Sequence, residues 1–161
     1  MAGKNTGGRV RCAVDAWASG RARAMTEALE QRIMLDSTVV FNEIMYHPKG
    51  TGAASDAQEY VELYNQMGVP VDLSGWSLKS GVDFTFDEGT ILAGGGHLVI
   101  AADPAALQAA TGFGGAIGPY SGHLSNSGEK LELDDKTGRV MDSVSYDTKG
   151  DWPGAPDGSG V

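Results

Sequence analysis

From residue 38 onward the chain is a succession of short apolar runs, some of them of period two, with glycine, proline or aspartate in the turns between them. The run 82–86 shows the pattern simply, because Val82, Phe84 and Phe86 alternate with polar residues. Such alternation turns one face of a strand toward a core and the other toward solvent. The expected strands cover residues 39–46, 59–65, 71–78, 82–86, 97–101, 129–133 and 139–146. Seven or eight short strands at this spacing predict an all-β sandwich.

Turn-forming residues separate these runs. Residues 134–138, Asp-Asp-Lys-Thr-Gly, predict a β-hairpin between the last two runs, because aspartate and glycine favour tight turns. We expect loops over 49–57 and 112–121 and one or two helical turns over 104–110. The expected core side chains of the third run are Val71, Leu73, Trp76 and Leu78.

The charge is unevenly spread along the chain. Residues 1–37 hold 6 basic and 4 acidic residues, whereas residues 38–161 hold 6 basic and 17 acidic residues, a net charge of −11. Affinity for nucleic acid comes largely from Lys and Arg on phosphates, so we expect no nucleic-acid partner. No apolar run reaches the roughly 20 residues that span a bilayer. The single cysteine, Cys12, excludes an internal disulfide.

The first 37 residues differ from the rest in the pattern of their apolar residues. Met25, Leu29 and Ile33 recur at a helical spacing and predict a weak amphipathic helix over 21–34. We therefore divide the chain into a basic leader, residues 1–37, helical or disordered, and a β domain, residues 38–161.

The β domain resembles the lamin-tail domain family in an ordered series of short blocks. These blocks are Asn42–Pro48, Glu59–Asn65, Val71–Leu78, Phe84–Phe86, Gly89–Gly94, Leu124–Glu129 and Asp151–Pro153. The resemblance implies an immunoglobulin-like β-sandwich. No catalytic residues are known for that domain, so none are carried over and we expect no enzyme activity.

The series is most similar to the bacterial form of the domain, which commonly stands in large secreted or surface proteins. Residues 27–36 are similar to the LEPR-XLL element at the N-terminus of such proteins, although Gln31 stands where that element has proline. Together these resemblances imply a protein-binding or structural and adhesion module of an extracellular or cell-surface protein.

Two other functions are compatible with the same resemblance. The domain often accompanies nucleases, phosphatases or kinase-like spore-coat-protein-H domains, so it is alternatively an accessory domain of a larger enzyme. A nuclear intermediate-filament tail is disfavoured by the acidic charge and by the lack of a heptad coiled coil.

The chain stops at Val161, where the family continues from Asp157–Gly160 into a last strand. We therefore expect a fragment that is truncated before this strand. An unpaired sheet edge left in its place would favour association.

Aromatic residues are the first candidates for a binding site. Tyr60, Tyr64 and Trp76 are candidates for a carbohydrate or peptide platform. Aromatic side chains in a β-sandwich are more often buried, so core packing is the preferred interpretation for Trp76. Both interpretations stay open for the two tyrosines.

Carboxylates are the candidates for catalysis. Glu43, Glu59 and Glu62 would supply the acid and base that glycoside hydrolysis requires. No nucleophile or orienting group accompanies them in the sequence, so we expect a solvated strand face instead.

Five aspartates are candidate calcium ligands, namely Asp134, Asp135, Asp142, Asp147 and Asp151. The EF-hand spacing is absent, so roles in turns and at strand ends are preferred. His47, His97 and His123 lack the paired spacing of a zinc site. The sequence therefore predicts no catalytic residue, no cofactor and no metal site.

Overall fold

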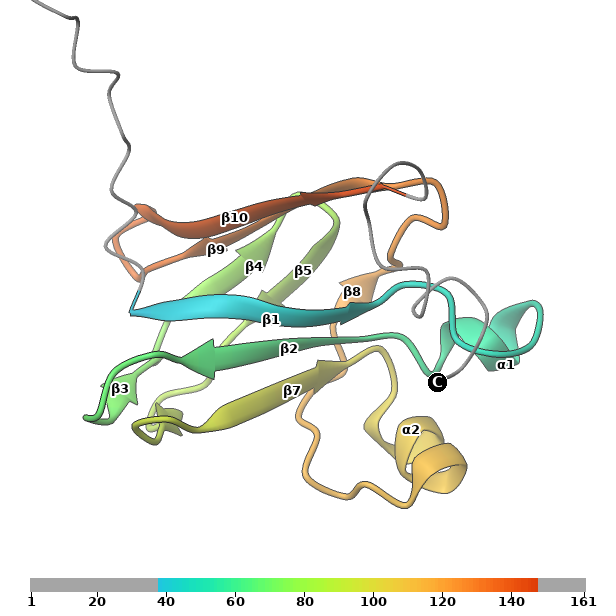
Figure 1. Ribbon diagram of the computed structural model, residues 1–161, viewed down its shortest axis with the longest axis horizontal. Helices are drawn as coiled ribbons and strands as arrows, with labels where there is room; N and C mark the ends of the chain where they lie inside the picture. Colours follow the sequence, from blue (N-terminus) through green and yellow to red (C-terminus); the bar gives the residue numbers. More distant parts are fainter. Residues whose placement is uncertain (1–37, 148–161) are drawn as a thin grey trace, which may run out of the picture. The chain divides into compact units, whose positions relative to one another are not determined.

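Residues 38–147 are described by the computed structural model, and their strands form two layered antiparallel sheets (Figure 1). The first sheet has the order β1-β2-β7 and the second has the order β10-β9-β4-β5-β8, while β3 and β6 form a small separate ladder. The strands are β1 (Val39–Met45), β2 (Tyr60–Asn65), β3 (Val71–Asp72), β4 (Ser77–Lys79), β5 (Val82–Thr85), β6 (Ile91–Leu92), β7 (His97–Ala101), β8 (Ser121–Gly122), β9 (Glu129–Asp134) and β10 (Val140–Tyr146). The all-β, immunoglobulin-like sandwich is confirmed.

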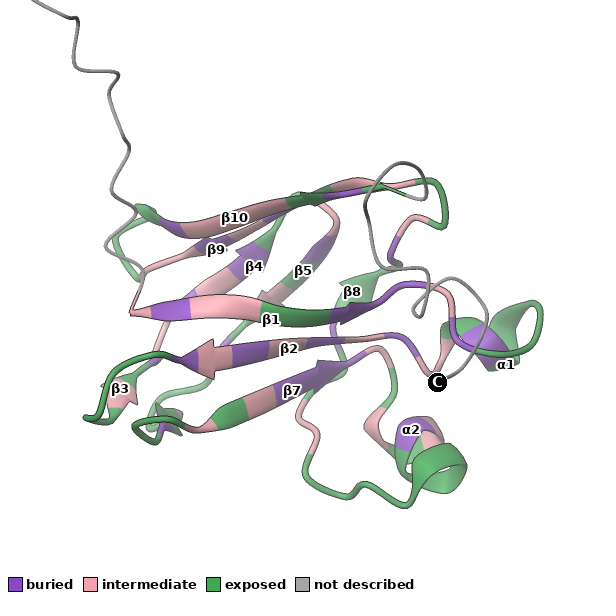
Figure 2. Cartoon of the chain, in the orientation of Figure 1, coloured by how far each residue is buried: buried purple, intermediate pink, exposed green. Residues whose placement is uncertain are grey.

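The core lies between the two sheets (Figure 2). Val61 and Leu63 of β2 belong to the same buried cluster as Leu131 and Leu133 of β9. Each buried aliphatic side chain contributes roughly 1.5–3 kcal/mol to folding. Trp76 is 8% exposed and lies in this cluster, which confirms its core role.

The two helices differ in how well the sequence predicts them. Helix α2 (Pro104–Thr111) falls where helical turns are expected, and the Asp103 side chain caps it by accepting from Ala105 N and Ala106 N at 2.9 and 3.1 Å. Helix α1 (Ala53–Asp56) corrects the expectation of a loop over 49–57. It is a single turn, too short to show a periodic pattern, and the buried Ser55 hydroxyl secures it by donating to Pro48 O at 2.7 Å.

The run 71–78 forms two strands in different sheets rather than one. The chain bends at Ser74-Gly75, as expected, after β3 and before β4. Leu73 and Leu78 are buried, but Val71 is only half-buried because it belongs to the small β3-β6 ladder at the margin. The expected hairpin of β9 and β10 is confirmed.

The Asn65 side chain forms hydrogen bonds with two turns at one end of the sandwich, the one that follows β2 and the one that follows β6. Its side chain is fully buried, and Nδ2 lies 2.8 Å from Val69 O and 3.1 Å from the carbonyl oxygens of Leu92 and Ala93. Its Oδ1 accepts from Met67 N at 2.9 Å. One amide group therefore satisfies backbone groups of two loops that are distant in sequence.

We predict that Asn65→Ala destabilises the domain by about 1–3 kcal/mol or more, because buried carbonyl and amide groups lose their partner. The free energy of unfolding from urea titration measures this loss. Asn42→Ala is the matched control, since Asn42 is exposed and its loss is expected to cost under about 1 kcal/mol. Equal losses in the two variants would contradict the role of Asn65.

Candidate functional site

A bulge in β1 places two consecutive side chains on the outer face of the three-stranded sheet. The register of β1 with β2 shifts between Phe41 and Glu43, so that Asn42 and Glu43 are both exposed. On β2, Tyr60, Glu62 and Tyr64 alternate with buried residues and lie on this same face. The outer face is defined here as Asn42, Glu43, Tyr60, Glu62, Tyr64 and His97.

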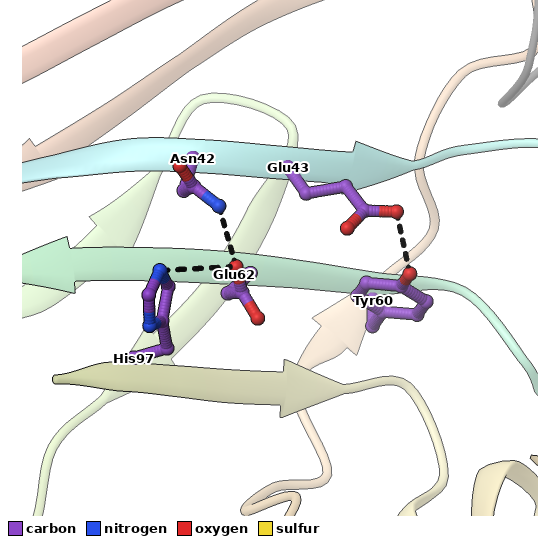
Figure 3. Close-up of polar contacts among 5 residues, drawn as sticks. All are labelled: Asn42, Glu43, Tyr60, Glu62 and His97. Atoms are coloured by element: carbon purple, nitrogen blue, oxygen red, sulfur yellow. Dashed lines mark hydrogen bonds and ion pairs between the residues drawn. The ribbon is translucent and has the colours of Figure 1, made fainter.

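Hydrogen bonds order the outer face (Figure 3). The Tyr60 hydroxyl donates to Glu43 Oε1 at 2.6 Å, and Asn42 Nδ2 donates to Glu62 Oε1 at 2.6 Å. His97 Nε2 lies 4.0 Å from the same Glu62 oxygen. Burial and the bond to Glu43 raise the pKa of the Tyr60 hydroxyl well above its usual value of 10.0, so it stays a donor at neutral pH.

An aromatic pair lies at the other end of the outer face. The rings of Tyr64 and His97 stack with their centroids 4.7 Å apart. Of the three aromatic candidates for a platform, Tyr60 and Tyr64 therefore lie on this face, whereas Trp76 lies in the core.

Two adjacent hollows lie where α2 meets the sheet, and both are lined by Tyr60, Leu107 and Thr111. The first, of about 230 Å³, is completed by Glu62, Val99 and Phe113. The second, of about 440 Å³, is completed by Glu43, Met45, Pro48, Lys49, Gln58 and Ala110. Sequence reasoning missed these hollows, because they depend on how α2 packs on β7 through Leu107.

The open side of β7 is occupied by the segment that follows α2. Ile117 N donates to Val99 O, and Ala101 N donates to Ile117 O, both at 2.9 Å. Ile117 thus forms a parallel bridge with Ile100 and uses backbone groups that β7 would otherwise expose.

The profile of the Lamin Tail Domain family matches residues 35–148. This chain belongs to the lamin tail domain family. A search of curated proteins finds no match to the chain. The segment that resembles the LEPR-XLL element, the expected helix over 21–34 and the last of the matching blocks, Asp151–Pro153, lie outside the described residues. Neither helix in the described part of this lamin tail domain is long and apolar enough to cross a bilayer.

Glu59 corrects the expectation of three acids on one solvated face. Glu43 and Glu62 are on the outer face, but Glu59 is 1% exposed. It lies two residues before the buried Val61, so in an extended chain both side chains point to the same, inner face. Its Oε2 accepts from Leu124 N at 2.8 Å and from the Tyr120 hydroxyl at 3.3 Å. The three carboxylates therefore form no common site.

Two of the candidate aspartates make local structural bonds, whereas Oδ1 of Asp134 is buried and has no hydrogen-bond partner among the described residues. Asp135 accepts from Thr137 N at 2.7 Å and from Arg139 N at 3.1 Å, which shapes the hairpin turn. Asp142 accepts from Phe41 N at 2.9 Å and so joins β10 to β1. Between residues 38 and 147 no group of three His, Cys, Asp or Glu side chains is placed to hold a metal ion, and Asp151 lies outside this range.

We predict that Glu59→Gln changes how stability depends on pH. Burial raises the pKa of the Glu59 carboxyl above its usual value of 4.5, against the opposing effect of the Leu124 bond. Its contribution to stability is therefore fully present below the unfolded-state pKa and is lost as the pH rises through the folded-state pKa. Glutamine keeps an acceptor but does not ionise, so wild type should lose stability relative to Glu59→Gln as the pH rises above the unfolded-state pKa of the carboxyl.

Melting temperatures of both proteins across this rise in pH measure the effect. Glu88→Gln, an exposed turn residue, controls for the loss of one negative charge. A difference between wild type and Glu59→Gln that stays constant with pH would contradict the prediction.

Proposed function

We propose that this lamin tail domain is a non-catalytic module that binds a protein partner through the outer face and the adjoining hollows. The position of Tyr60 carries the proposal. Its half-buried ring lies between the two hollows, and its hydroxyl is fixed by Glu43. An aromatic side chain held in one conformation loses little entropy on binding, and such residues commonly dominate the energy of interfaces.

The surroundings of Tyr60 suit protein contact. Phe113 is 47% exposed at the rim of the first hollow, and Val99 and Leu107 supply further apolar surface. Polar groups of the outer face surround this apolar part. A nonpolar centre with a polar rim is the usual composition of a protein interface.

The bonding of the acids supports binding rather than catalysis. Glu43 and Glu62 are each fixed by a neutral donor, Tyr60 or Asn42, which orients the carboxylates. Glu59 has a raised pKa that would suit an acid catalyst, but its side chain is buried and its Oε2 accepts hydrogen bonds from Leu124 N and the Tyr120 hydroxyl. Its bonds secure a loop rather than face a substrate.

We further propose that the module serves in a large extracellular or cell-surface protein of a bacterium. The likeness of residues 27–36 to the LEPR-XLL element and of the β domain to the bacterial form supports this placement. The accessory domain of a larger enzyme stays the alternative, and the sequence of the surrounding gene distinguishes the two.

A random peptide library selected on the domain tests the proposed binding face. We expect the enriched peptides to lose about tenfold in affinity for Tyr60→Ala and for Phe113→Ser, because both substitutions remove apolar surface at the hollows. Ile91→Ser is the matched control, since Ile91 is 56% exposed on β6, outside the outer face. Peptides that respond to Ile91→Ser and to neither of the other two would refute the proposal.

A further inference from the structure

Two glutamates of the outer face occupy directly opposite positions on neighbouring strands, and no lysine or arginine of residues 38–147 is paired with either. The strand register pairs Glu43 directly with Glu62. Like charges at directly opposite positions of an antiparallel pair are unfavourable. In the described part of the chain no lysine or arginine forms an ion pair with either carboxylate, and His97 pairs with Glu62 only when it is protonated.

Each of these carboxylates also lines a hollow that is otherwise largely apolar. Glu62 lines the first hollow beside Val99, Leu107 and Phe113. Glu43 lines the second, where Lys49 is the one basic side chain among the described lining residues. The arrangement presents negative charge next to nonpolar surface, which is complementary to a partner segment that alternates basic and aliphatic side chains.

We propose that the Glu43–Glu62 pair and the hollows beside α2 bind a cationic, aliphatic segment of a protein partner, a proposal that rests on the proposed function. A lysine or arginine of the partner sits between the two carboxylates and relieves their repulsion. A neighbouring aliphatic side chain enters the first hollow against Leu107 and Phe113. Tyr60 and Asn42 both donate to Oε1 of their glutamate, which leaves Oε2 of each glutamate for the partner.

The charge of the whole β domain favours this partner. Residues 38–161 carry 17 acidic and 6 basic residues, so a cationic segment is attracted over a distance of about a Debye length. The attraction weakens as salt is added, so the association rate should fall with ionic strength.

A designed peptide tests the proposal directly. In an extended chain, residues i, i+2 and i+4 lie on one side, so Lys-Ser-Leu-Ser-Lys presents two amines beside one aliphatic side chain. Matched peptides carry glutamine for lysine or serine for leucine. Fluorescence anisotropy of the labelled peptides on the full chain gives the dissociation constants.

We expect the lysine peptide to bind saturably and to bind at least about tenfold more weakly to Glu43→Gln/Glu62→Gln. Asp87→Asn/Glu88→Gln removes the same number of charges from an exposed turn and should change the dissociation constant less than about twofold. If both double variants weakened binding of the lysine peptide equally, the effect would come from net charge alone, and the proposal would be overturned.

Other outcomes separate the proposal from the function on which it rests. If the glutamine peptide, or neutral peptides from the library, bind as tightly and depend on Tyr60, the face binds protein but the cationic partner is wrong. If no peptide responds to any substitution on the outer face, both ideas fail. Calcium titrated alone by calorimetry, with heat that Glu43→Gln/Glu62→Gln abolishes, would instead make the pair a metal site and overturn the proposal.

Discussion

Buried polar side chains at the two ends of β2 hold the sandwich closed. At one end Glu59 accepts from the backbone of Leu124, and at the other Asn65 donates to the carbonyl oxygens of Leu92 and Ala93, where the chain leaves β6. Backbone groups at the ends of a sandwich are buried without a strand partner, and each would cost roughly 1–3 kcal/mol if left unsatisfied. Because β2 is the middle strand of its sheet, these bonds connect the centre of that layer to the loop between β8 and β9 of the other layer and to the turn between β6 and β7.

The alternation along this strand also separates residues that stabilise the fold from residues that are available for binding. Glu59, Val61, Leu63 and Asn65 face inward and serve the fold, whereas Tyr60 and its outward neighbours form the surface that we propose for binding. Substitutions on the outward side should therefore change recognition with little effect on stability. The separation follows from the pleat of a strand, which sends successive side chains to opposite faces.

Much of this fold could be predicted from residue patterns alone. The strands, the last hairpin, α2 and the buried Trp76 all follow from period-two alternation, turn residues and aromatic size. Helix α1 and the two-residue strands are too short to repeat a pattern. Glu59 lies two residues before the inward-facing Val61, so the alternation predicts an inward position, but a carboxylate in a core is rare.

The candidate site was harder to predict than the fold, since it depends on contacts between segments. The bulge in β1 moves Glu43 opposite Glu62, and nothing in the run 39–46 marks the extra residue. The hollows arise because the packing of Leu107 on β7 brings α2 beside Tyr60, which lies more than forty positions earlier in the chain.

The bridge made by Ile117 has a consequence for how this domain recognises anything at the β7 side. Sheets often capture peptides by adding a strand at an edge, where main-chain hydrogen bonds supply the affinity. Here Ile117 already takes the donor of Ala101 and the acceptor of Val99. A partner that binds on this side therefore contacts side chains rather than those backbone groups. Its specificity then depends on side-chain chemistry, which single substitutions can change during evolution.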